Sequence, residues 1–553
     1  MSFFDDASLA FLPSGGAGKD GKTYSIKPTD GSGDFTFSRG SNLSATRVGP
    51  TGLIEKGREN LLLRSNQFNT SPWFVTGIDT PTSGQTGYDG SSDAWTLEKN
   101  GAYAYLYQDK SISGVQTFSF YGKAGTIPQA RITINTSAVN VTAAFDLANG
   151  IDLGGSQNIT SSIESVGNGW YRCSVTYNQG TTSRFRIYPA DVGGDLSGTS
   201  GSIYIQDSQV EIGLAATEVI TTGATTGKAG LLEDEPRFDY SGGATCPSLL
   251  LEPSRTNLIG YSEYINESVA SWSRFFSTII TNNDAISPDG KNNATKIECP
   301  IGQSARVDAI VSGLSAGTYT YSFYAKGNVS NLDVNIYQNA TGDTLSSTAI
   351  ETLINDSEWS RVDITFTSTA SSTIRCIYAN LTAGEYFYMW GAQLEQASYP
   401  TSYIPNHSGG SVTRGADGIS KDLTSVVNGN QMTMFLDLKS HISIGTQTNA
   451  LWGDLRWYHK SNNRILFYKN DDAINIGGDI TINGRTKIAL SITTTDAKVF
   501  VNGSQVYTTS LPTPFVDFGE LIYEILNSKE EWNQFLIFST PLSDADCITL
   551  TTL

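Results

Sequence analysis

One short motif occurs twice in this chain, and it constrains the fold more than any other feature. Each copy places Glu, Arg and Asn at the same spacing between apolar residues, and a Trp follows each copy. These residues are Glu55, Arg58, Asn60 and Trp73 in the first copy, and Glu252, Arg255, Asn257 and Trp272 in the second. An internal duplication of this kind indicates repeated structural units.

The correspondence continues downstream of both motifs. Matching segments are 117–123 with 320–326, Trp170 with Trp359, and 209–211 with 393–395. Residues 60–213 and 258–397 are therefore predicted to be two copies of one domain. Short runs of alternating apolar and polar residues, separated by Gly, Asn and Ser turns, predict an antiparallel β-sandwich in each copy. Trp170 and Trp359 are expected to occupy the same core position.

The rest of the chain divides around these copies. Residues 1–59 are rich in Gly, Ser and Asp and are predicted to form an extended arm that lies on another surface. Residues 214–257 and 398–424 are predicted to be connectors. Residues 425–553 have a different pattern and form a third predicted β domain, with a hairpin at Asn502-Gly503 between two strand-like runs.

Composition and charge exclude several classes of function. The formal net charge of −18 argues against nucleic-acid binding, because the sequence has no run of five or more Lys and Arg residues that could displace phosphate counterions. Five scattered Cys and three His do not indicate a disulfide framework or a zinc site. The sequence lacks an apolar run long enough for a membrane span, and its acidic start does not fit a secretory signal. We therefore expect no membrane insertion and no export by a signal peptide.

Several segments together resemble bacteriophage virion appendage proteins of the tail-fibre or head-fibre kind. They are 34–41, 45–48, 52–55, 236–240, 246–258, 390–395 and 401–405. The resemblance implies an all-β chain with two jelly-roll repeats that are similar to carbohydrate-binding modules. It also implies that residues 425–553 form a concanavalin- or laminin-G-like sandwich. One departure is that residues 206–208 replace the Trp-Gly-Ala found at 390–392, so the two copies need not share a ligand.

The same resemblance sets the functional expectation. It implies a non-enzymatic virion structural protein, made in the host cytoplasm, that mediates attachment to host cell-surface glycans. The N-terminal arm would bind other virion proteins, and the chain would form a homo-oligomer, with a trimer favoured and a dimer next. One alternative is a purely structural decoration, collar or tail component, and another is a glycan-degrading tailspike. Catalysis is not expected, because no pair of carboxylates with the spacing of a glycanase stands out.

Two loops are candidates for a structural calcium ion. Asp89-Gly90 and Asp289-Gly290 occupy matching positions in the two copies. An Asp that supports a Gly at positive φ in a turn accounts for both pairs. Calcium, which takes six to eight oxygen ligands, is the second interpretation, with Asp89 and Asp289 as metal ligands.

Aromatic residues that occur in only one copy are the candidates for sugar stacking. They include Trp95, Tyr103, Tyr105, Tyr107, Trp452, Trp457 and Tyr458. If 454–459 is a strand, Asp454, Arg456 and Tyr458 share one face, and they form the predicted ligand-binding set. The repeated Glu55/Arg58 and Glu252/Arg255 pairs are interpreted as a structural clamp, with sugar binding as the alternative.

Overall fold

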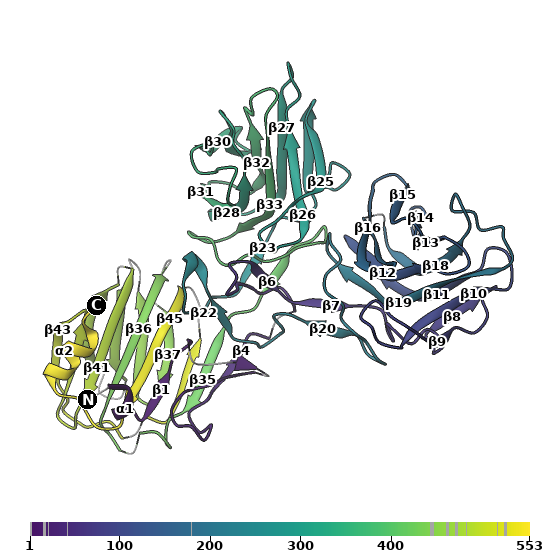
Figure 1. The fold of residues 1–553 in the computed structure, drawn as a ribbon. Helices are drawn as coiled ribbons and strands as arrows, with labels where there is room; N and C mark the ends of the chain where they lie inside the picture. The colour runs from purple at the N-terminus through teal and green to yellow at the C-terminus, as the bar shows by residue number, and fades with distance from the viewer. Residues whose placement is uncertain are drawn as a thin grey trace.

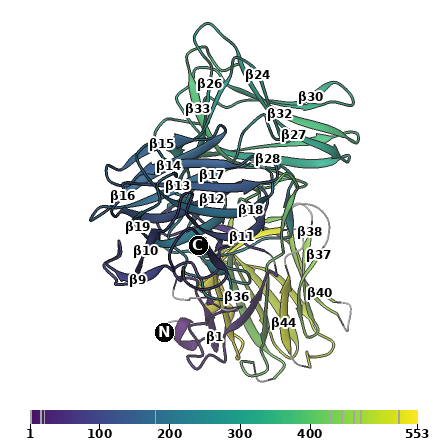
Figure 2. The same ribbon diagram turned by 90° about the vertical axis from the view of Figure 1, so that its right-hand side faces the viewer.

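The computed structural model describes residues 3–14, 18–19, 21–40, 42–178, 180–427, 429–442, 447–460, 464–470, 474–482, 484–516, 518–524 and 528–553. Three β-sandwiches surround a junction of short strands (Figures 1 and 2). The predicted all-β class, with tandem antiparallel sandwiches, is confirmed. Within the described residues, no helix is both long and apolar enough to cross a membrane.

The first sandwich consists of two six-stranded antiparallel sheets. One sheet has the order β16 (Ile159–Gly167), β17 (Trp170–Tyr177), β12 (Gln116–Ala124), β19 (Gly201–Ile212), β10 (Ala94–Lys99) and β9 (Thr82–Gln85). The other has the order β15 (Ile151–Gly155), β14 (Val141–Asp146), β13 (Gln129–Thr136), β18 (Thr182–Ala190), β11 (Tyr105–Ile112) and β8 (Trp73–Thr76). Residues that alternate along these strands, such as Leu106, Phe118 and Ile187, fill the core between the sheets.

The second sandwich repeats this strand order with two five-stranded sheets. One sheet is β31 (Ser360–Ser368), β28 (Gly317–Lys326), β33 (Tyr386–Glu395), β26 (Asn292–Glu298) and β25 (Ile279–Ile286). The other is β30 (Asp343–Ala349), β29 (Asp333–Gln338), β32 (Ser372–Ala379), β27 (Ala305–Leu314) and β24 (Trp272–Phe276). The matching order shows that the duplicated sequence encodes a duplicated topology, to which the first copy adds strands β15 and β16 at the sheet edges.

The repeated Asn is a buried clip at the entrance to each sandwich. The Asn60 side chain donates to the carbonyls of Ser208 and Ile220 at 3.1 and 2.9 Å, and it accepts from the amides of Leu62 and Val210. Asn257 forms the same four bonds, to Ala392, Ile404, Ile259 and Leu394. Since burial of an unpaired amide is costly, the fully used hydrogen-bonding capacity explains why Asn stands at both positions.

The repeated tryptophans occupy two different environments. Trp73 and Trp272 lie in the main cores. The prediction that Trp170 and Trp359 lie in those cores is wrong, because they pack in equivalent small clusters outside them, with Tyr121 and Tyr324 respectively. Trp170 is buried, whereas Trp359 is only half-buried. The sequence match identified the equivalence, but not the face of the sheet on which the indoles stand.

The third sandwich is assembled from both ends of the chain and from both connectors. One sheet is β21 (Arg237–Asp239), β22 (Ser248–Leu251), β45 (Ser528–Phe538), β36 (Met432–Ile442), β41 (Arg485–Ile492), β42 (Asp496–Val501) and β43 (Ser504–Ser510), with β1 (Leu9–Phe11) also paired to β45. The other is β2 (Gly18–Lys19), β3 (Lys22–Thr23), β4 (Phe35–Ser38), β35 (Gly418–Asp422), β44 (Glu520–Glu524), β37 (Gln447–Trp452), β38 (Leu455–Lys460), β39 (Arg464–Lys469) and β40 (Ile474–Thr481). Helices α1 (Phe3–Asp6) and α2 (Asp544–Thr551) lie beside it (Figure 1). The predicted hairpin is present, with Asn502 and Gly503 at positive φ between β42 and β43.

The N-terminal segment therefore differs from the extended attachment arm that composition predicts. Its β1 residues are all buried and pair with β45. Along β4, Phe35 and Phe37 are buried while Thr36 and Ser38 face solvent. The Phe35 ring contacts those of Phe11 and Phe535 at 5.6 and 5.9 Å. The few apolar residues of this segment cannot form a core alone, but they complete one that belongs to the C-terminal domain.

Three two-stranded ladders and a short 3-10 turn connect the sandwiches. The ladders are β5 (Thr46–Val48) with β6 (Ile54–Lys56), β7 (Arg58–Asn60) with β20 (Gly227–Ala229), and β23 (Arg255–Asn257) with β34 (Val412–Arg414). The 3-10 turn is η1 (Ser241–Gly243). These segments meet at the centre of the molecule, where the connectors run past one another (Figure 1).

A fully buried network of charged side chains occupies this junction. Glu252 accepts from Arg237 at 2.7 Å and lies 2.9 Å from Arg414. Asp417 pairs with Arg237 and, at 3.4 Å, with Arg39. Burial alone would raise the pKa of Glu252, but Arg414 and Arg237 outweigh it and hold that pKa well below its usual range. The N-terminal segment and both connectors are therefore tied together by buried charges.

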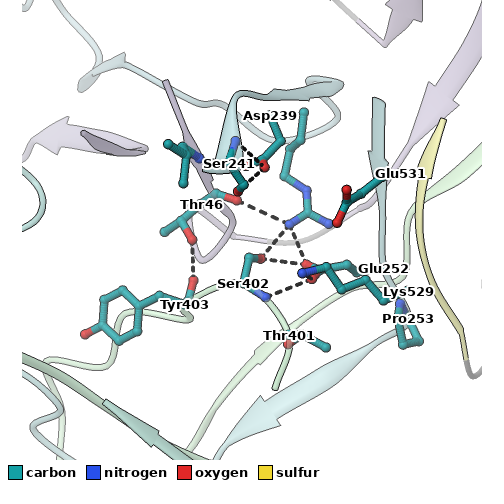
Figure 3. Close-up of polar contacts among 12 residues, drawn as sticks. Thr46, Asp239, Ser241, Glu252, Pro253, Thr401, Ser402, Tyr403, Lys529 and Glu531 are labelled. Carbon is teal, nitrogen blue, oxygen red and sulfur yellow. Dashed lines mark hydrogen bonds and ion pairs between the residues drawn. The ribbon is translucent and has the colours of Figure 1, made fainter. Parts of the chain in front are cut away.

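Backbone and hydroxyl groups complete the network, as Figure 3 shows. The Ser402 amide and hydroxyl donate to Glu252 at 2.8 and 2.6 Å. Arg237 also donates to the Thr46 carbonyl at 3.2 Å, and the Thr46 hydroxyl donates to the Tyr403 carbonyl at 2.6 Å. The clamp expected of the Glu252/Arg255 pair forms with other partners, because Glu252 binds Arg237 and Arg414 while Arg255 donates to the Ser254 carbonyl at 2.8 Å. In the first copy, by contrast, Glu55 forms a partly exposed pair with Arg47 at 2.8 Å.

The N-terminal strands generate the first prediction. Replacing Phe35 by Ala should destabilise the third sandwich by about 3–5 kcal/mol, because a buried aromatic ring is lost from its core. Thr36→Ala, one position along the same strand and exposed, should change stability by less than about 0.5 kcal/mol. Chemical unfolding of the full chain measures both. Equal stability of the two variants would contradict the assignment of β4 to this core.

The duplicated motif supplies a matched pair for the second prediction. Glu252→Ala leaves buried guanidinium groups without their carboxylate and should cost about 3–5 kcal/mol. Glu55→Ala, at the same motif position in the first copy, removes a surface pair and should cost less than about 1 kcal/mol. Thermal unfolding at neutral pH compares them, and a larger effect at Glu55 would show that the junction does not depend on Glu252.

Candidate functional site

The predicted ligand-binding set of the third sandwich is only partly brought together. Residues of β38 alternate as expected, with Leu455 and Trp457 buried and with Arg456 and Tyr458 on the other face. Asp454, however, precedes the strand, and its carboxylate lies 3.1 Å from the ammonium of the buried Lys469. Arg456 donates to nearby backbone carbonyls. Only Arg456 and Tyr458 therefore remain on the proposed face.

The other unrepeated aromatics divide between core and surface. Trp95 and Trp457 are buried in the cores of the first and third sandwiches, and the side chain of Trp452 lies outside the described residues. Tyr103 is 64% exposed in the loop before β11. Tyr105 and Tyr107 follow on β11, where they face outward and are half-buried. These two tyrosines belong to an outer surface of the first sandwich on which several aromatic side chains gather.

Aromatic and guanidinium groups alternate across neighbouring strands on the outer side of the β15–β8 sheet. The tyrosine–arginine face, as we call this surface, consists of Phe74, Tyr105, Tyr107, Asp109, Arg131, Arg184, Arg186 and Tyr188. Strand pairing sets Tyr107 opposite Phe74 on one side and Arg186 on the other. Inward residues of the same strands, such as Leu106 and Ile187, fill the core, so pleating directs this set outward.

The side chains of this face stack on one another. The Tyr107 ring lies 5.4 Å from the Phe74 ring and 4.1 Å from the guanidinium carbon of Arg184. The Tyr105 ring lies 5.0 Å from that of Tyr188 and 4.8 Å from the guanidinium of Arg186. Such contacts restrict the rotation of the rings and of the guanidinium groups that lie against them. Phe74, on the edge strand β8, is 47% exposed.

The two guanidinium groups of β18 have different partners. Arg184 forms a two-bond ion pair with Asp109, at 2.5 and 2.9 Å. This pair holds the pKa of Asp109 below its usual value. Arg186 donates to the Tyr188 hydroxyl at 3.2 Å. The side chain of Arg131 forms no hydrogen bond or ion pair with any described residue. Two of the three cations therefore face outward without a carboxylate.

The corresponding face of the second sandwich has different chemistry. When Trp73 and Trp272 are matched through their strand partners, Arg306 and Asp308 take the places of Tyr105 and Tyr107. Asp308 accepts two bonds from Arg306 at 2.7 Å and one from Arg375 at 2.9 Å. Both cations thus share one carboxylate within the face, and the tyrosines are specific to the first copy.

Both Asp-Gly candidates for calcium form the turn that the first interpretation predicts. Asp89 accepts from the amide of Ser91, and Asp289 from that of Lys291, each at 3.0 Å, while the following Gly has a positive φ. Among the described residues, no group of three or more His, Cys, Asp and Glu side chains could hold a metal ion. Asp289 is buried and lies 2.9 Å from the Lys56 ammonium, which already supplies the compensating positive charge. Calcium at Asp89 stays a prediction.

The Asp89 loop adjoins an unusual carboxyl group. Asp207 has a φ of 44° where the second copy has Gly391, and its side chain is 8% exposed. It accepts from the Tyr88 hydroxyl at 3.0 Å, and the Tyr88 ring stacks on Tyr121 at 3.7 Å. Burial, with a further contribution from Asp93 and Asp89, raises the pKa of Asp207 to about 6.

A cavity of about 440 Å³ lies between the first two sandwiches and their connectors. Lys56 contacts it, held by Asp289 and by Glu263 at 3.2 Å. Glu218 pairs with Arg58 of the linker and with Lys291 of the second sandwich. The charged residues around this cavity are thus paired mostly with one another, which favours a role in joining the modules.

Sequence reasoning found only part of the tyrosine–arginine face. It identified Tyr105 and Tyr107 but missed Phe74, Arg131, Arg184, Arg186 and Tyr188. The available signal was the pattern of β18, where Arg184, Arg186 and Tyr188 alternate with the buried Phe185 and Ile187. That pattern indicates one outward face, and strand pairing is what places it beside the tyrosines.

No protein-family model and no curated protein matches the chain. Among solved structures, the chain is similar to the CBM22-1–CBM22-2 tandem of Paenibacillus barcinonensis Xyn10C, with 12% identity, 65% of this chain and 100% of that chain covered, and a TM-score of 0.22. It is also similar to the enzymatically active domain of bacteriophage CBA120 tailspike protein 4, with 10% identity, 25% and 21% covered, and a TM-score of 0.21.

A further similar structure is domain 4 of AbnA, a GH43 extracellular arabinanase from Geobacillus stearothermophilus, in complex with arabinotriose. The identity is 17%, the coverage is 25% of this chain and 73% of that chain, and the TM-score is 0.21. The chain spans about a fifth of the tailspike structure, for which 21% is covered. At such TM-scores these likenesses carry no argument about function.

Asp207 supplies the prediction from this subsection. Its raised pKa means that the folded state binds the proton more tightly than the unfolded state, whose Asp pKa is about 3.9. Stability is therefore unaffected below about pH 4, falls between about pH 4 and 6, and remains lower above that range. Asp207→Asn should raise stability at pH 8 by about 2 kcal/mol and leave it unchanged at pH 3.5.

Thermal unfolding across pH 3.5–8 measures this effect. Asn also tolerates the positive φ at this position. Asp343→Asn, on an exposed residue of β30, serves as the control and should leave the pH profile unaltered. A parallel shift of the Asp207→Asn curve at every pH would show that the carboxyl charge is not the cause.

Proposed function

We propose that this protein is a non-enzymatic, carbohydrate-binding component of a virion appendage, and that it binds glycan through the tyrosine–arginine face. The observation that supports this is the set of tyrosines and arginines that pack together on the outer side of one sheet of the first sandwich. On the equivalent face of the second sandwich, the arginines already bind a carboxylate of the chain itself, Asp308. A duplicated scaffold with one diversified face fits a recognition module.

The chemistry of the face suits a saccharide. A pyranose presents apolar ring faces and many hydroxyl groups, so it binds where aromatic carbon and hydrogen-bonding groups lie close together. Phe74 offers an exposed ring at the sheet edge, and the phenol and guanidinium groups of Tyr105, Tyr107 and Arg186 stand beside it. The contacts among these side chains fix their positions before a ligand arrives, which lowers the entropy cost of binding.

Attachment to the particle and self-association are part of the same proposal. The N-terminal segment is committed to the third sandwich, where β1 pairs with β45. Contacts with other virion proteins, and with further copies in a trimer or dimer, would therefore use the outer surfaces of folded modules instead of a free arm.

A purely structural appendage component is the second candidate. The buried network of Arg237, Glu252, Arg414 and Asp417 favours it, because a junction fixed by buried charges suits a rigid spacer. Such a protein would bind no saccharide through any of its sheets.

Glycan-array binding by the full chain tests the proposal. Phe74→Ala and Tyr107→Ala should each weaken the best saccharide about tenfold, because loss of about 1.4 kcal/mol of contact energy has that effect on Kd. Phe276→Ala, an exposed Phe at 72% on the matching strand of the second sandwich, is the control and should bind normally. Unchanged binding by both test variants would exclude this face, and loss only in Tyr458→Ala would move the site to β38.

A further inference from the structure

We infer that the ligand of the tyrosine–arginine face is an acidic saccharide, one that carries carboxylate groups. This inference rests on the proposed function and adds the chemical class of the ligand. It depends on which surfaces the stacked side chains leave open, on the charge balance of the face, and on the comparison with its copy.

The contacts among these side chains cover ring faces of Tyr105 and Tyr107 and leave Phe74 as the exposed ring. Tyr107 lies between Phe74 and the Arg184 guanidinium, at 5.4 and 4.1 Å, and Tyr105 lies against Arg186 and Tyr188. Tyr188 is buried beside Leu196, and the partly exposed Tyr105, Tyr107 and Arg186 carry the phenol hydroxyls and guanidinium N–H groups of this surface. A surface made mostly of donors requires a ligand rich in acceptors, and carboxylate oxygens accept more strongly than hydroxyls.

The charge of the face runs opposite to that of the chain. It carries Arg131, Arg184 and Arg186 against the single carboxylate of Asp109, although the whole chain has a net charge of −18. Arg184 is paired with Asp109, and Arg186 donates only to a neutral hydroxyl. Positive charge is thus concentrated at one place and cannot be attributed to a generally basic protein.

The two cations without a carboxylate are neighbours in the sheet. Arg131 pairs across the strands with Tyr188, and Thr133, two positions further along β13, pairs with Arg186. Arg131 and Arg186 therefore stand diagonally on the same face, at a separation of roughly 7–8 Å between backbones that long side chains readily span. A carboxylate between them could accept from both guanidinium groups, whose planar forks suit this geometry.

The second sandwich supports the inference from within the molecule. On its equivalent face, Asp308 stands between Arg306 and Arg375 and accepts three hydrogen bonds from them. Outward arginines on this scaffold can thus hold a carboxylate. In the first sandwich the position of Asp308 is taken by Tyr107, the counterpart of Arg375 is Arg184 with its partner Asp109, and Arg131 and Arg186 are left able to take a carboxylate from a ligand.

Matched pairs of acidic and neutral saccharides test the inference on the full chain. The panel contains oligogalacturonates and their methyl esters, hyaluronan fragments and their carboxyl-reduced forms, and oligosialic acid and its methyl ester. We expect the unsubstituted protein to bind the tightest acidic saccharide at least tenfold more tightly than the neutral form of that saccharide at low salt. The affinity for the acid should fall as the NaCl concentration is raised. A single-stranded oligo(dT) serves as a non-saccharide polyanion and should bind more weakly than that acid.

Variants separate charge recognition from general contact. Arg131→Gln and Arg186→Gln should each weaken the acid about tenfold and leave the neutral partner unchanged, whereas Phe74→Ala should weaken both. Arg274→Gln is the matched control, since Arg274 lies on β24 of the second sandwich and pairs with Glu267 at 2.6 Å. Circular dichroism confirms folding, and Arg131→Lys, which keeps the charge, should retain part of the preference.

The outcomes distinguish the proposed glycan site from the inference that its ligand is acidic. Equal affinity for acid and neutral partner, with Phe74→Ala still harmful, overturns the acidic ligand and retains the glycan site. Tighter binding of oligo(dT) than of any acid also overturns it, because a nucleic acid would then be the better polyanionic ligand. Absence of binding to every saccharide of the panel overturns the proposed function together with this inference.

Discussion

The arrangement of the three sandwiches depends on a buried network of charged side chains. Glu252 and Asp417 have no exposed surface, and neither do Arg237 and Arg414, yet the pairs join two different connectors, 214–257 and 398–424. Desolvation of such groups is repaid only when each finds its partners in the right geometry. The network therefore selects one arrangement of the connectors, and with it the places at which the three sandwiches begin.

The sequence reveals the modules more readily than their connections. Alternation and turn residues such as Asn502-Gly503 are local signals, and the duplicated Asn60 and Asn257 mark equivalent positions whatever their role. The partners of Phe35 are not local, because its core is built by residues several hundred positions away. Alternation shows that a strand has one buried face, but it does not show what covers that face, and the same limit misplaced Trp170 and Trp359.

The candidate site illustrates the same limit at the level of single residues. Tyr105 and Tyr107 stand out in the sequence because they have no counterpart in the second copy. Arg184 and Arg186 become their neighbours only after β11 and β18 pair. One scaffold thus carries two outward faces, one in which Asp308 binds both arginines and one with two cations that have no carboxylate partner in the described part of the chain. Duplication left the cores alike and allowed the surfaces to diverge.

The pairing of β1 with β45 also constrains the order in which the chain can fold. Ser8 and Ser539 share a hydrogen bond across 531 positions, so β1 waits for the synthesis of β45 before it can pair. At about 5–20 residues per second, that wait is roughly half a minute to two minutes. The first two sandwiches can close during synthesis, whereas the core around Leu9, Phe11 and Phe35 stays incomplete until β45 has been made. Completion of the third sandwich thus comes after both repeats have had time to fold.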